Sequence, residues 1–407
     1  MRVWIENPFD TLPIEGSRPQ RYWLMAQAFA DAGHAVDYWT SDFNHAFKRP
    51  RVTDDVSLWP AATPRVSNGA VTLLFVPTRP YAKNVGVGRI LSHRAYARTW
   101  GELAKRHARF CGKPDVIIVS SPPLSTGDVA IKLAKKYGAK LVVDMMDAWP
   151  QTFYRLLPFG FRWLGPILLT PARRAASRAL AAADLVTGVA ARYGRLAREA
   201  GAREYVLAYH GVEMTSPVRR EPSDRLRLAY VGSMGRTYAL ETVIRAVARR
   251  PETTLDLAGG GEKLEALKAL AEATGCADRV RFRGHLDDVG LRAMLSSCDV
   301  GIVPMSDESC VGVPYKFGDY TRAGLAIVSS LAGESEALLA EFGAGLRYLP
   351  GETDDLVARL GEVRARLAAM QAASRRLAEE RFDARRIYFA YVRRVEDLVE
   401  AAKEARR

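Results

Sequence analysis

The sequence predicts an α/β protein with two doubly wound domains. Its 407 residues exceed what one ordinary hydrophobic core supports. Short apolar runs alternate with helical patterns along the chain, and the alternation restarts after a polar stretch at 217–225. We therefore expect an N-terminal domain at 1–215, a C-terminal domain at 216–380, and a last helix at 381–407 that packs back on the first domain.

Composition and charge are those of a globular protein with a basic surface. Hydrophobic residues make up 48% and charged residues 26% of the sequence. The formal net charge is +13, and between residues 151 and 205 nine arginines stand against three acidic residues. Such an excess favours nucleic acid, anionic lipid or a phosphorylated substrate. Dispersed cysteines, no apolar leader and no long apolar run lead us to expect a cytoplasmic protein.

The first elements are predicted as strand, loop, helix and strand. Residues 1–6 form an apolar run, residues 21–32 have helical spacing, and residues 35–40 form the next apolar run. The loop between the first two contains Gly16, where a phosphate or sugar can approach because glycine has no side chain. The spacing is not GxGxxG, so a plain tight turn is the alternative.

Two later strand ends are candidate binding sites, because open α/β sheets bind ligands at the carboxyl ends of their strands. Ser121 and Pro122 follow one strand, and Asp147 follows the next. We expect Asp147 to orient a substrate hydroxyl or to act as a base, and the alternative is a cap for the turn before Pro150. The strands expected in this half after residue 40 are 71–76, 115–120, 140–144, 184–188 and 205–209.

The segment 153–183 mixes aromatic and aliphatic residues with arginines, among them Arg173 and Arg174. This composition fits a contact at a membrane interface, and Gly165 and Pro166 break the run, so it does not span. The alternative is an ordinary core helix with an arginine-rich solvent face. Without a stacking pattern or a reader motif, we expect no nucleic-acid partner.

The second half repeats the alternation and adds two glycine loops. Strands are expected at 226–231, 254–258, 279–283, 299–303, 326–329 and 345–348. The loop 232–238 and the loop 259–262 each follow a strand, and Arg236 in the first is well placed to grip a diphosphate. Residues 354–407 are predicted helical, with a candidate break at 380–383.

The stretch 311–324 is predicted to form a loop and a short helix between two strands. Pro314 suits the first helical turn and Gly324 the left-handed stop. Lys316 and Asp319 are three residues apart and share one face, so the lysine can attract a phosphate and the carboxylate can bind sugar hydroxyls. A surface helix with an ion pair is the alternative.

In this order the N-terminal glycine loop, Gly33-His34, residues 210–213, the two later glycine loops and residues 314–324 resemble the family 4 glycosyltransferases of GT-B fold, especially the bacterial surface-polysaccharide members. The resemblance implies two Rossmann-like domains: an acceptor-binding N-terminal domain and a C-terminal domain that holds a nucleotide-diphosphate sugar. It implies transfer of a hexose with retention to a lipid-linked or glycan acceptor, at the inner face of the cell membrane. The donor is the implied substrate, and no cofactor is expected.

The resemblance also assigns residues. Arg236 and Lys316 would stabilise the leaving diphosphate, Asp319 would bind the ribose, and with Asp147 the first two form the predicted catalytic set. The remaining predicted donor contacts are Gly16, Gly232, Ser233, Gly235, Gly259, Gly260, Gly261, Glu262, Val313 and Pro314. The predicted acceptor contacts are Ser17, Arg18, Ser121 and Pro122. The sequence has no Asp-X-Asp triplet, which agrees with chemistry that needs no metal.

Two positions depart from the family pattern. Family members often carry a glutamate eight residues before the position of Asp319, but this chain has Val311 there, with Glu308 as the nearest substitute. Tyr238 stands where a second basic residue is common in the first glycine loop. The alternatives to a glycosyltransferase are a nucleotide-sugar 2-epimerase of the same architecture and a non-enzymatic protein that binds nucleotide or nucleic acid.

Overall fold

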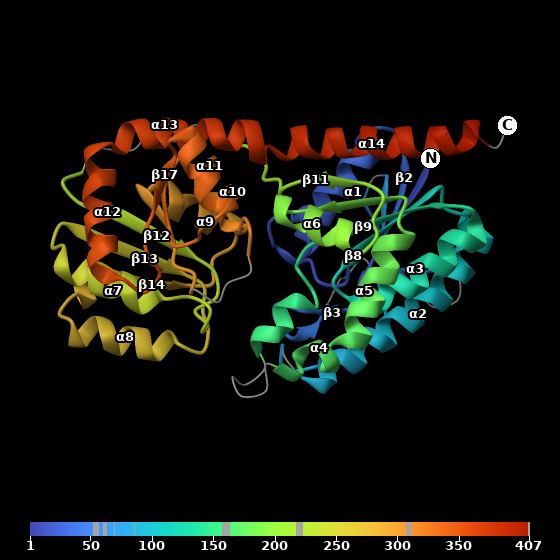
Figure 1. Cartoon of the computed structure of the whole chain (residues 1–407), viewed down its shortest axis with the longest axis horizontal. Coiled ribbons are helices and arrows are strands. Elements are labelled where there is room, and N and C mark those ends of the chain that lie inside the picture. Colours follow the sequence, from blue (N-terminus) through green and yellow to red (C-terminus); the bar gives the residue numbers. More distant parts are fainter. Residues whose placement is uncertain are drawn as a thin grey trace. The chain divides into compact units, whose positions relative to one another are not determined.

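The computed structural model describes residues 1–51, 57–59, 63–68, 70–84, 86–156, 163–216, 223–306 and 311–405. Contacts divide the chain into two units (Figure 1). The first unit comprises Met1–Gly211 together with Arg385–Arg407, and the second comprises Val212–Ala384. The α/β class and the two parallel-sheet domains predicted from the sequence are confirmed.

Within its described residues, the first unit contains a nine-stranded sheet in the order β11-β10-β9-β8-β1-β2-β7-β6-β5. The strands from β11 to β7 are parallel to their neighbours, while β6 runs antiparallel to β7 and to β5. The strand bounds are β1 Arg2–Glu6, β2 Ala35–Ser41, β5 Ser57–Trp59, β6 Thr63–Asn68, β7 Val71–Val76, β8 Val116–Ser121, β9 Lys140–Met145, β10 Leu185–Gly188 and β11 Tyr205–Leu207. The sequence did not indicate β5, β6 or the small hairpin of β3 (Phe43–Asn44) with β4 (Arg49–Pro50), since β3, β4 and β5 have only two or three residues and β6 carries a proline and an asparagine.

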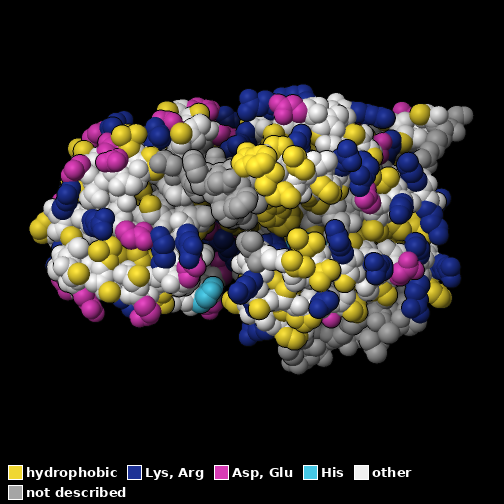
Figure 2. Space-filling view, turned by 60° about the horizontal axis from the view of Figure 1, so that its bottom comes forward, with side chains coloured by type: hydrophobic (Ala, Val, Ile, Leu, Met, Phe, Trp, Pro, Cys, Tyr) yellow, Lys and Arg dark blue, Asp and Glu magenta, His cyan; other side chains and the backbone are white. Residues whose placement is uncertain are grey.

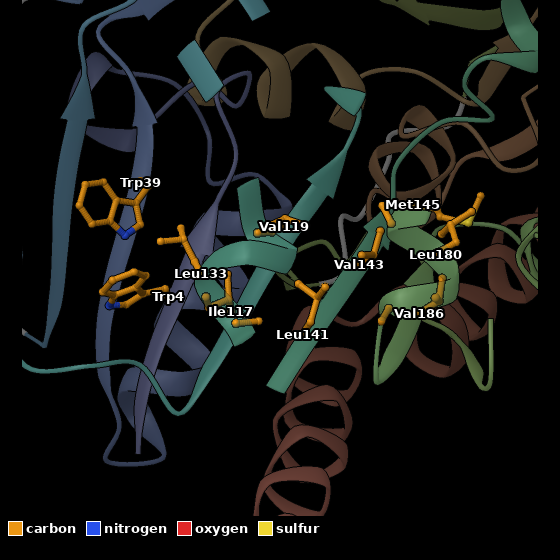
Figure 3. Packing of buried hydrophobic residues seen from close by; sticks show 14 of the residues in the cluster. Trp4, Trp39, Ile117, Val119, Leu133, Leu141, Val143, Met145, Leu180 and Val186 are labelled. Carbon is orange, nitrogen blue, oxygen red and sulfur yellow. The ribbon is translucent and has the colours of Figure 1, made fainter. Parts of the chain in front are cut away.

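Helices cover both faces of this sheet, as the crossovers between parallel strands require. They are α1 Arg21–Asp31, α2 Val87–Cys111, α3 Leu124–Tyr137, α4 Gly165–Leu168, α5 Thr170–Ala182, α6 Ala191–Glu199 and α14 Ala384–Glu404. On one face, Trp4 and Trp39 of neighbouring strands and Ile117 of β8 pack against Leu133 of α3 (Figure 3). The two indole rings meet edge to face with centroids 5.7 Å apart.

Helix α14 packs within the first unit, where Figure 1 shows it running beside α1. The imidazole of His34 lies 2.8 Å from the carboxylate of Glu396, and Phe29 meets Tyr391 edge to face. The helical stretch that precedes it breaks at Asp383, within the predicted interruption, after a π-helical turn at Ala378–Phe382.

The second unit holds a parallel six-stranded sheet in its described residues, in the order β14-β13-β12-β15-β16-β17. Its strands are β12 Leu226–Val231, β13 Thr253–Ala258, β14 Val280–Gly284, β15 Val300–Val303, β16 Ala326–Ser329 and β17 Gly345–Arg347. Its helices are α7 Leu240–Arg249, α8 Leu264–Ala273, α9 Asp288–Ser296, α10 Lys316–Arg322, α11 Glu334–Phe342, α12 Thr353–Ala365 and α13 Leu367–Leu377. The strand order reverses between β12 and β15, and sheets of this kind bind ligands at that point.

A buried ion pair ties the loops of the first unit together. Arg21 donates through Nε and Nη2 to the carboxylate of Asp144, with both bonds at 2.8 Å and both side chains fully buried. Its Nη1 donates to the carbonyls of Ala208 and Tyr209. Burial alone would raise the pKa of Asp144, but the Arg21 guanidinium and its hydrogen bonds hold that pKa below the usual value.

We expect Asp144→Asn to destabilise the first unit by about 3–5 kcal/mol, because the guanidinium of Arg21 is then buried without its counter-charge. Denaturant unfolding followed by tryptophan fluorescence measures this loss. The matched control is Asp128→Asn, which breaks the exposed pair of Asp128 with Arg178 and should cost less than about 1 kcal/mol. Equal losses in the two variants would contradict the central role of the buried pair.

Candidate functional site

The two predicted glycine loops of the second unit lie against each other at the carboxyl ends of β12 and β13. Gly232 donates its N–H to the carbonyl of Ala258 at 3.0 Å, and Met234 donates to the carbonyl of Gly260 at 2.8 Å. A Cβ on Gly259 would lie 2.0 Å from the carbonyl oxygen of Gly232, and one on Gly261 would lie 2.7 Å from that of Met234. These two glycines are therefore required for the contact between the loops, whereas a Cβ on Gly260 would meet open space.

Lys316 projects into the same loop pair from α10. Its ammonium lies 4.1 Å from the ring centroid of Tyr230 and 4.3 Å from that of Tyr238. A Cβ on Gly232 would stand 3.3 Å from Nζ, so the absence of a side chain there keeps the lysine in reach of the loop backbone. In the described part of the chain, Nζ has no hydrogen-bond partner.

The environment of Lys316 is unusual for a lysine. Burial lowers its pKa from 10.5 to about 7, although the nearby Asp319 carboxylate opposes that shift. Two aromatic faces stabilise the ammonium through their quadrupoles but offer it no hydrogen bond. A buried cation in this condition gains from any anion that can reach it. Tyr238, which departs from the family pattern, is thus one wall around the lysine.

Arg236 lies at the outer rim of the two loops. Its side chain is 86% exposed and its Nε lies 3.3 Å from a carboxylate oxygen of Glu262 in the second loop. Arg236 and Glu262 were both predicted from the sequence to interact with the donor. An arginine with this freedom can turn toward a phosphate, but its predicted catalytic role stays a prediction.

Helix α10 is a buried helix, so the alternative of a surface helix with an ion pair is wrong: all seven of its residues are buried. It begins at Lys316, two residues after Pro314, and its predicted stop at Gly324 has a left-handed φ of 66°. The carboxylate of Asp319 lies 3.5 Å from Arg322 of the same helix. Asp319 as the ribose ligand stays a prediction.

The segment before α10 contains the second departure from the family pattern. Ser335 donates to the carbonyl of Gly312 and holds this segment against α11. Val313 is buried, so a contact from it to a ligand would come from its backbone. Glu308, the carboxylate that we considered as a substitute at Val311, lies outside the described residues.

In the first unit, Asp147 occupies the turn before Pro150, as the capping alternative predicts. It accepts hydrogen bonds from the N–H of Ala148, the indole of Trp149 and the hydroxyl of Thr152, at 2.8, 3.1 and 3.2 Å. Burial nevertheless raises its pKa. Three donors fix the carboxylate in the turn, and its role toward a substrate stays a prediction.

The predicted acceptor residues fall into two places in the first unit. The carbonyl of Ser121, at the end of β8, accepts a hydrogen bond from Met146, so Ser121 and its neighbour Pro122 lie beside the loop of Asp147. Ser17 and Arg18 follow Gly16, which has a left-handed φ of 74° and would leave open space around a Cβ. The positive charge of Arg18 helps to lower the pKa of the half-buried His210.

Sequence reasoning missed several aromatic residues at both sites. Tyr230 lies inside an apolar strand pattern, and nothing in that pattern marks it as a wall around Lys316. In the first unit, rings and one arginine from four separate segments meet at the carboxyl ends of the strands. These segments share no motif in the sequence, so only the fold shows that their side chains lie together.

The second unit, whose glycine loops and lysine are described above, matches a known family of enzymes. Residues 225–365 match the family described as "Glycosyl transferases group 1". The match begins one residue before β12 and ends with α12, so it contains both glycine loops and Lys316.

Among individual proteins, the lipopolysaccharide core biosynthesis glycosyltransferase LpsE of Rhizobium meliloti (strain 1021) is 37% identical over 87 residues, which are 21% of this chain and 25% of that protein. The solved structure of sucrose-phosphate synthase from Thermosynechococcus elongatus is similar with a TM-score of 0.75 and 15% identity, over 98% of this chain and 99% of that one. The structure of Anabaena HepE in complex with UDP and glucose is similar with a TM-score of 0.67 and 14% identity, over 98% of this chain and 100% of that one. At these identities the structures establish the fold.

We expect the affinity for UDP-glucose to fall as the pH rises from 6 to 9, by up to about tenfold per unit above the lysine pKa, because only protonated Lys316 attracts the diphosphate. Isothermal titration calorimetry measures this, since the diphosphate of UDP-glucose keeps its charge over the range and the uracil ring begins to ionise only near its upper end. In Lys316→Gln the affinity should be weaker and independent of pH. Lys268→Gln, at an exposed lysine of the same unit, should keep the wild-type profile.

Lys316 should also make the stability of the ligand-free protein depend on pH. The pKa of Lys316 is lower in the folded than in the unfolded chain, so the unfolded chain binds more protons between pH 7 and 10.5. Stability should therefore rise with pH across this window, and Lys316→Gln should remove that rise.

Proposed function

We propose that the protein is a glycosyltransferase that uses a nucleotide-diphosphate sugar as donor. The observation that carries the proposal is the pair of interlocked glycine loops with the buried ammonium of Lys316 beside them, at the point where the strand order of the second sheet reverses. Exposed backbone in glycine loops suits the close approach of a diphosphate, and a buried cation compensates its charge. The printed titles of the HepE structures, with UDP, UDP and glucose, and UDP-glucose, support this donor class.

The reaction we propose is transfer of a hexose with retention, without a metal. Breaking the bond between the sugar and the diphosphate leaves negative charge on the diphosphate. Lys316, held between two rings, and Arg236, which can turn toward a phosphate, would stabilise that charge as the leaving group develops. Family 4 and the retaining outcome rest on the resemblance of the sequence.

The acceptor that we propose is lipid-linked or part of a glycan, in the biosynthesis of a cell-surface polysaccharide or glycolipid. LpsE, by its name, acts in lipopolysaccharide core biosynthesis, and this supports the pathway class. In this proposal the first unit receives the acceptor and the protein works on the cytoplasmic side of the membrane.

A peripheral membrane contact is part of the proposal. Trp163, just before α4, is 72% exposed, and Ile167, within α4, is 68% exposed. The exposed Arg173 and Arg174 follow on α5. Figure 2, which brings the bottom of Figure 1 forward, shows hydrophobic side chains gathered on this part of the unit, with lysines and arginines around them. Aromatic anchors flanked by cations suit the interface of an anionic leaflet. Among the helices of the described ranges, none is both long and apolar enough to cross a bilayer.

The donor is tested by a thermal-shift screen of uridine, guanosine, thymidine and adenosine diphosphate sugars. The true donor should stabilise the protein by about 2.7 kcal/mol at a hundredfold excess over its Kd, and Lys316→Gln should lose most of this. Release of nucleoside diphosphate that depends on added acceptor distinguishes transfer from epimerisation or hydrolysis. No stabilisation by any nucleotide or nucleotide sugar would overturn the proposal.

The membrane contact is tested by co-sedimentation with vesicles that contain anionic phospholipid. The wild type should bind at low salt, and both the double change Trp163→Ser with Ile167→Ser and the charge reversal Arg173→Glu with Arg174→Glu should weaken binding at least fivefold. Val289→Ser is the matched control, because Val289 is equally exposed but lies on the second unit. Binding that all variants retain would count against this surface.

A further inference from the structure

The first unit carries a group of aromatic side chains around one arginine that the proposed function has not used. We call it the Arg89 cluster and define it as Phe9, His45, Tyr81, Arg89, His93 and Trp149. Phe9 follows β1, His45 follows β2 and β3, Tyr81 follows β7 and precedes α2, and Trp149 follows β9. All of these segments leave the carboxyl ends of parallel strands, where such sheets bind ligands.

Arg89 is held between two rings. The carbon at the centre of its guanidinium lies 5.0 Å from the ring centroid of Trp149 and 5.5 Å from that of Phe9. Its Nε donates to Nε2 of His93 at 3.3 Å, and its Nη1 donates to the carbonyl of Asn84 at 2.7 Å. These contacts fix the plane of the guanidinium, and a side-chain hydrogen bond with Tyr81 adds to them.

The charge of the cluster is positive. Burial, followed by the neighbouring cations, lowers the pKa of His45 and of His93 to about 3, so both imidazoles are neutral at physiological pH. Lys48 adds a second cation, 4.8 Å from the ring centroid of Tyr81. The carboxylate of Asp147, which three donors fix in its turn, acts against this charge at Arg89.

The surface of the cluster is accessible from outside but has little room inside. Phe9, His45, Tyr81, Arg89 and Trp149 are half-buried. The cavity enclosed behind Phe9, His45, Tyr81 and His93 has a volume of about 10 Å³, which is room for one water molecule at most. A ligand larger than water therefore has to bind over the outer surface of the cluster.

The geometry points to the Arg89 cluster as the acceptor subsite, with a sugar that carries a phosphate as its ligand; this rests on the proposed function. The faces of a sugar ring are apolar C–H surfaces that pack on aromatic rings such as Trp149 and Tyr81. The phosphate pairs with Arg89, whose planar donors fit its oxygens, and with Lys48. The cluster thus selects an anionic acceptor over a neutral one. Residues predicted from the sequence for the acceptor, Ser121 and Pro122, lie beside the same turn through Met146.

The first experiment measures binding of α-glucose 1-phosphate, methyl α-glucoside and inorganic phosphate by saturation-transfer NMR. We expect the wild type to bind the sugar phosphate at least tenfold more tightly than the neutral glucoside or phosphate alone. Arg89→Gln should lose at least tenfold in affinity for the sugar phosphate, and Arg89→Lys should recover part of it. Arg98→Gln, at an exposed arginine on the opposite face of α2, should bind as the wild type does.

A second measurement separates this inference from the donor assignment and identifies the source of the phosphate. UDP affinity should be the same in the wild type, Arg89→Gln and Arg98→Gln, which also shows that the variants are folded. A sugar diphosphate on a short prenyl chain should have a lower KM than glucose 1-phosphate if the acceptor is lipid-linked, and an equal KM if it is soluble. If Arg89→Gln binds the sugar phosphate as tightly as the wild type does, the subsite is overturned. If the wild type does not bind UDP, the donor assignment is overturned instead.

Discussion

The first unit depends on the fully buried pair of Arg21 and Asp144. One guanidinium joins α1 to the end of β9 and to the chain that leaves β11, and the carboxylate also accepts hydrogen bonds from Tyr22 and Thr187. A buried pair of this kind is costly to desolvate, so it contributes geometry more than net stability. That geometry fixes the end of β9, from which the turn of Asp147 and Trp149 projects.

In the second unit, hydrogen bonds between backbone groups, in place of a buried ion pair, hold the loops at the strand ends. Its two glycine loops share hydrogen bonds, and Gly259 and Gly261 allow an approach that any side chain would prevent. Two of the glycines that we assigned to donor contacts are thus needed first for the loops to meet. Gly260 and Gly232 differ from them, because one faces open space and the other faces the ammonium of Lys316. A diphosphate thus has room to approach the backbone at Gly260, and it would meet the ammonium at Gly232.

The sequence predicted what local patterns determine. Apolar runs located most of the parallel strands of both sheets within a residue or two, and the glycine loops and Lys316 proved to be neighbours. It could not predict pairings between distant residues: Arg21 and Asp144 are 123 positions apart, and either alone reads as a surface charge. Tyr230 was missed because an aromatic residue in an apolar pattern is typical of a core, and the rings around Arg89 were missed because they come from segments far apart in the sequence.

The two units share one device, a cation held between aromatic rings at the carboxyl ends of parallel strands. Lys316 lies between Tyr230 and Tyr238, and Arg89 between Phe9 and Trp149. A ring fixes the position of the cation and carries no formal charge, while one carboxylate also acts on each cation, Asp319 on Lys316 and Asp147 on Arg89. An incoming phosphate, which carries more charge than one carboxylate, can still pair with the cation. This argues that both substrates of the proposed reaction are recognised through their phosphates, the donor at Lys316 and the acceptor at Arg89.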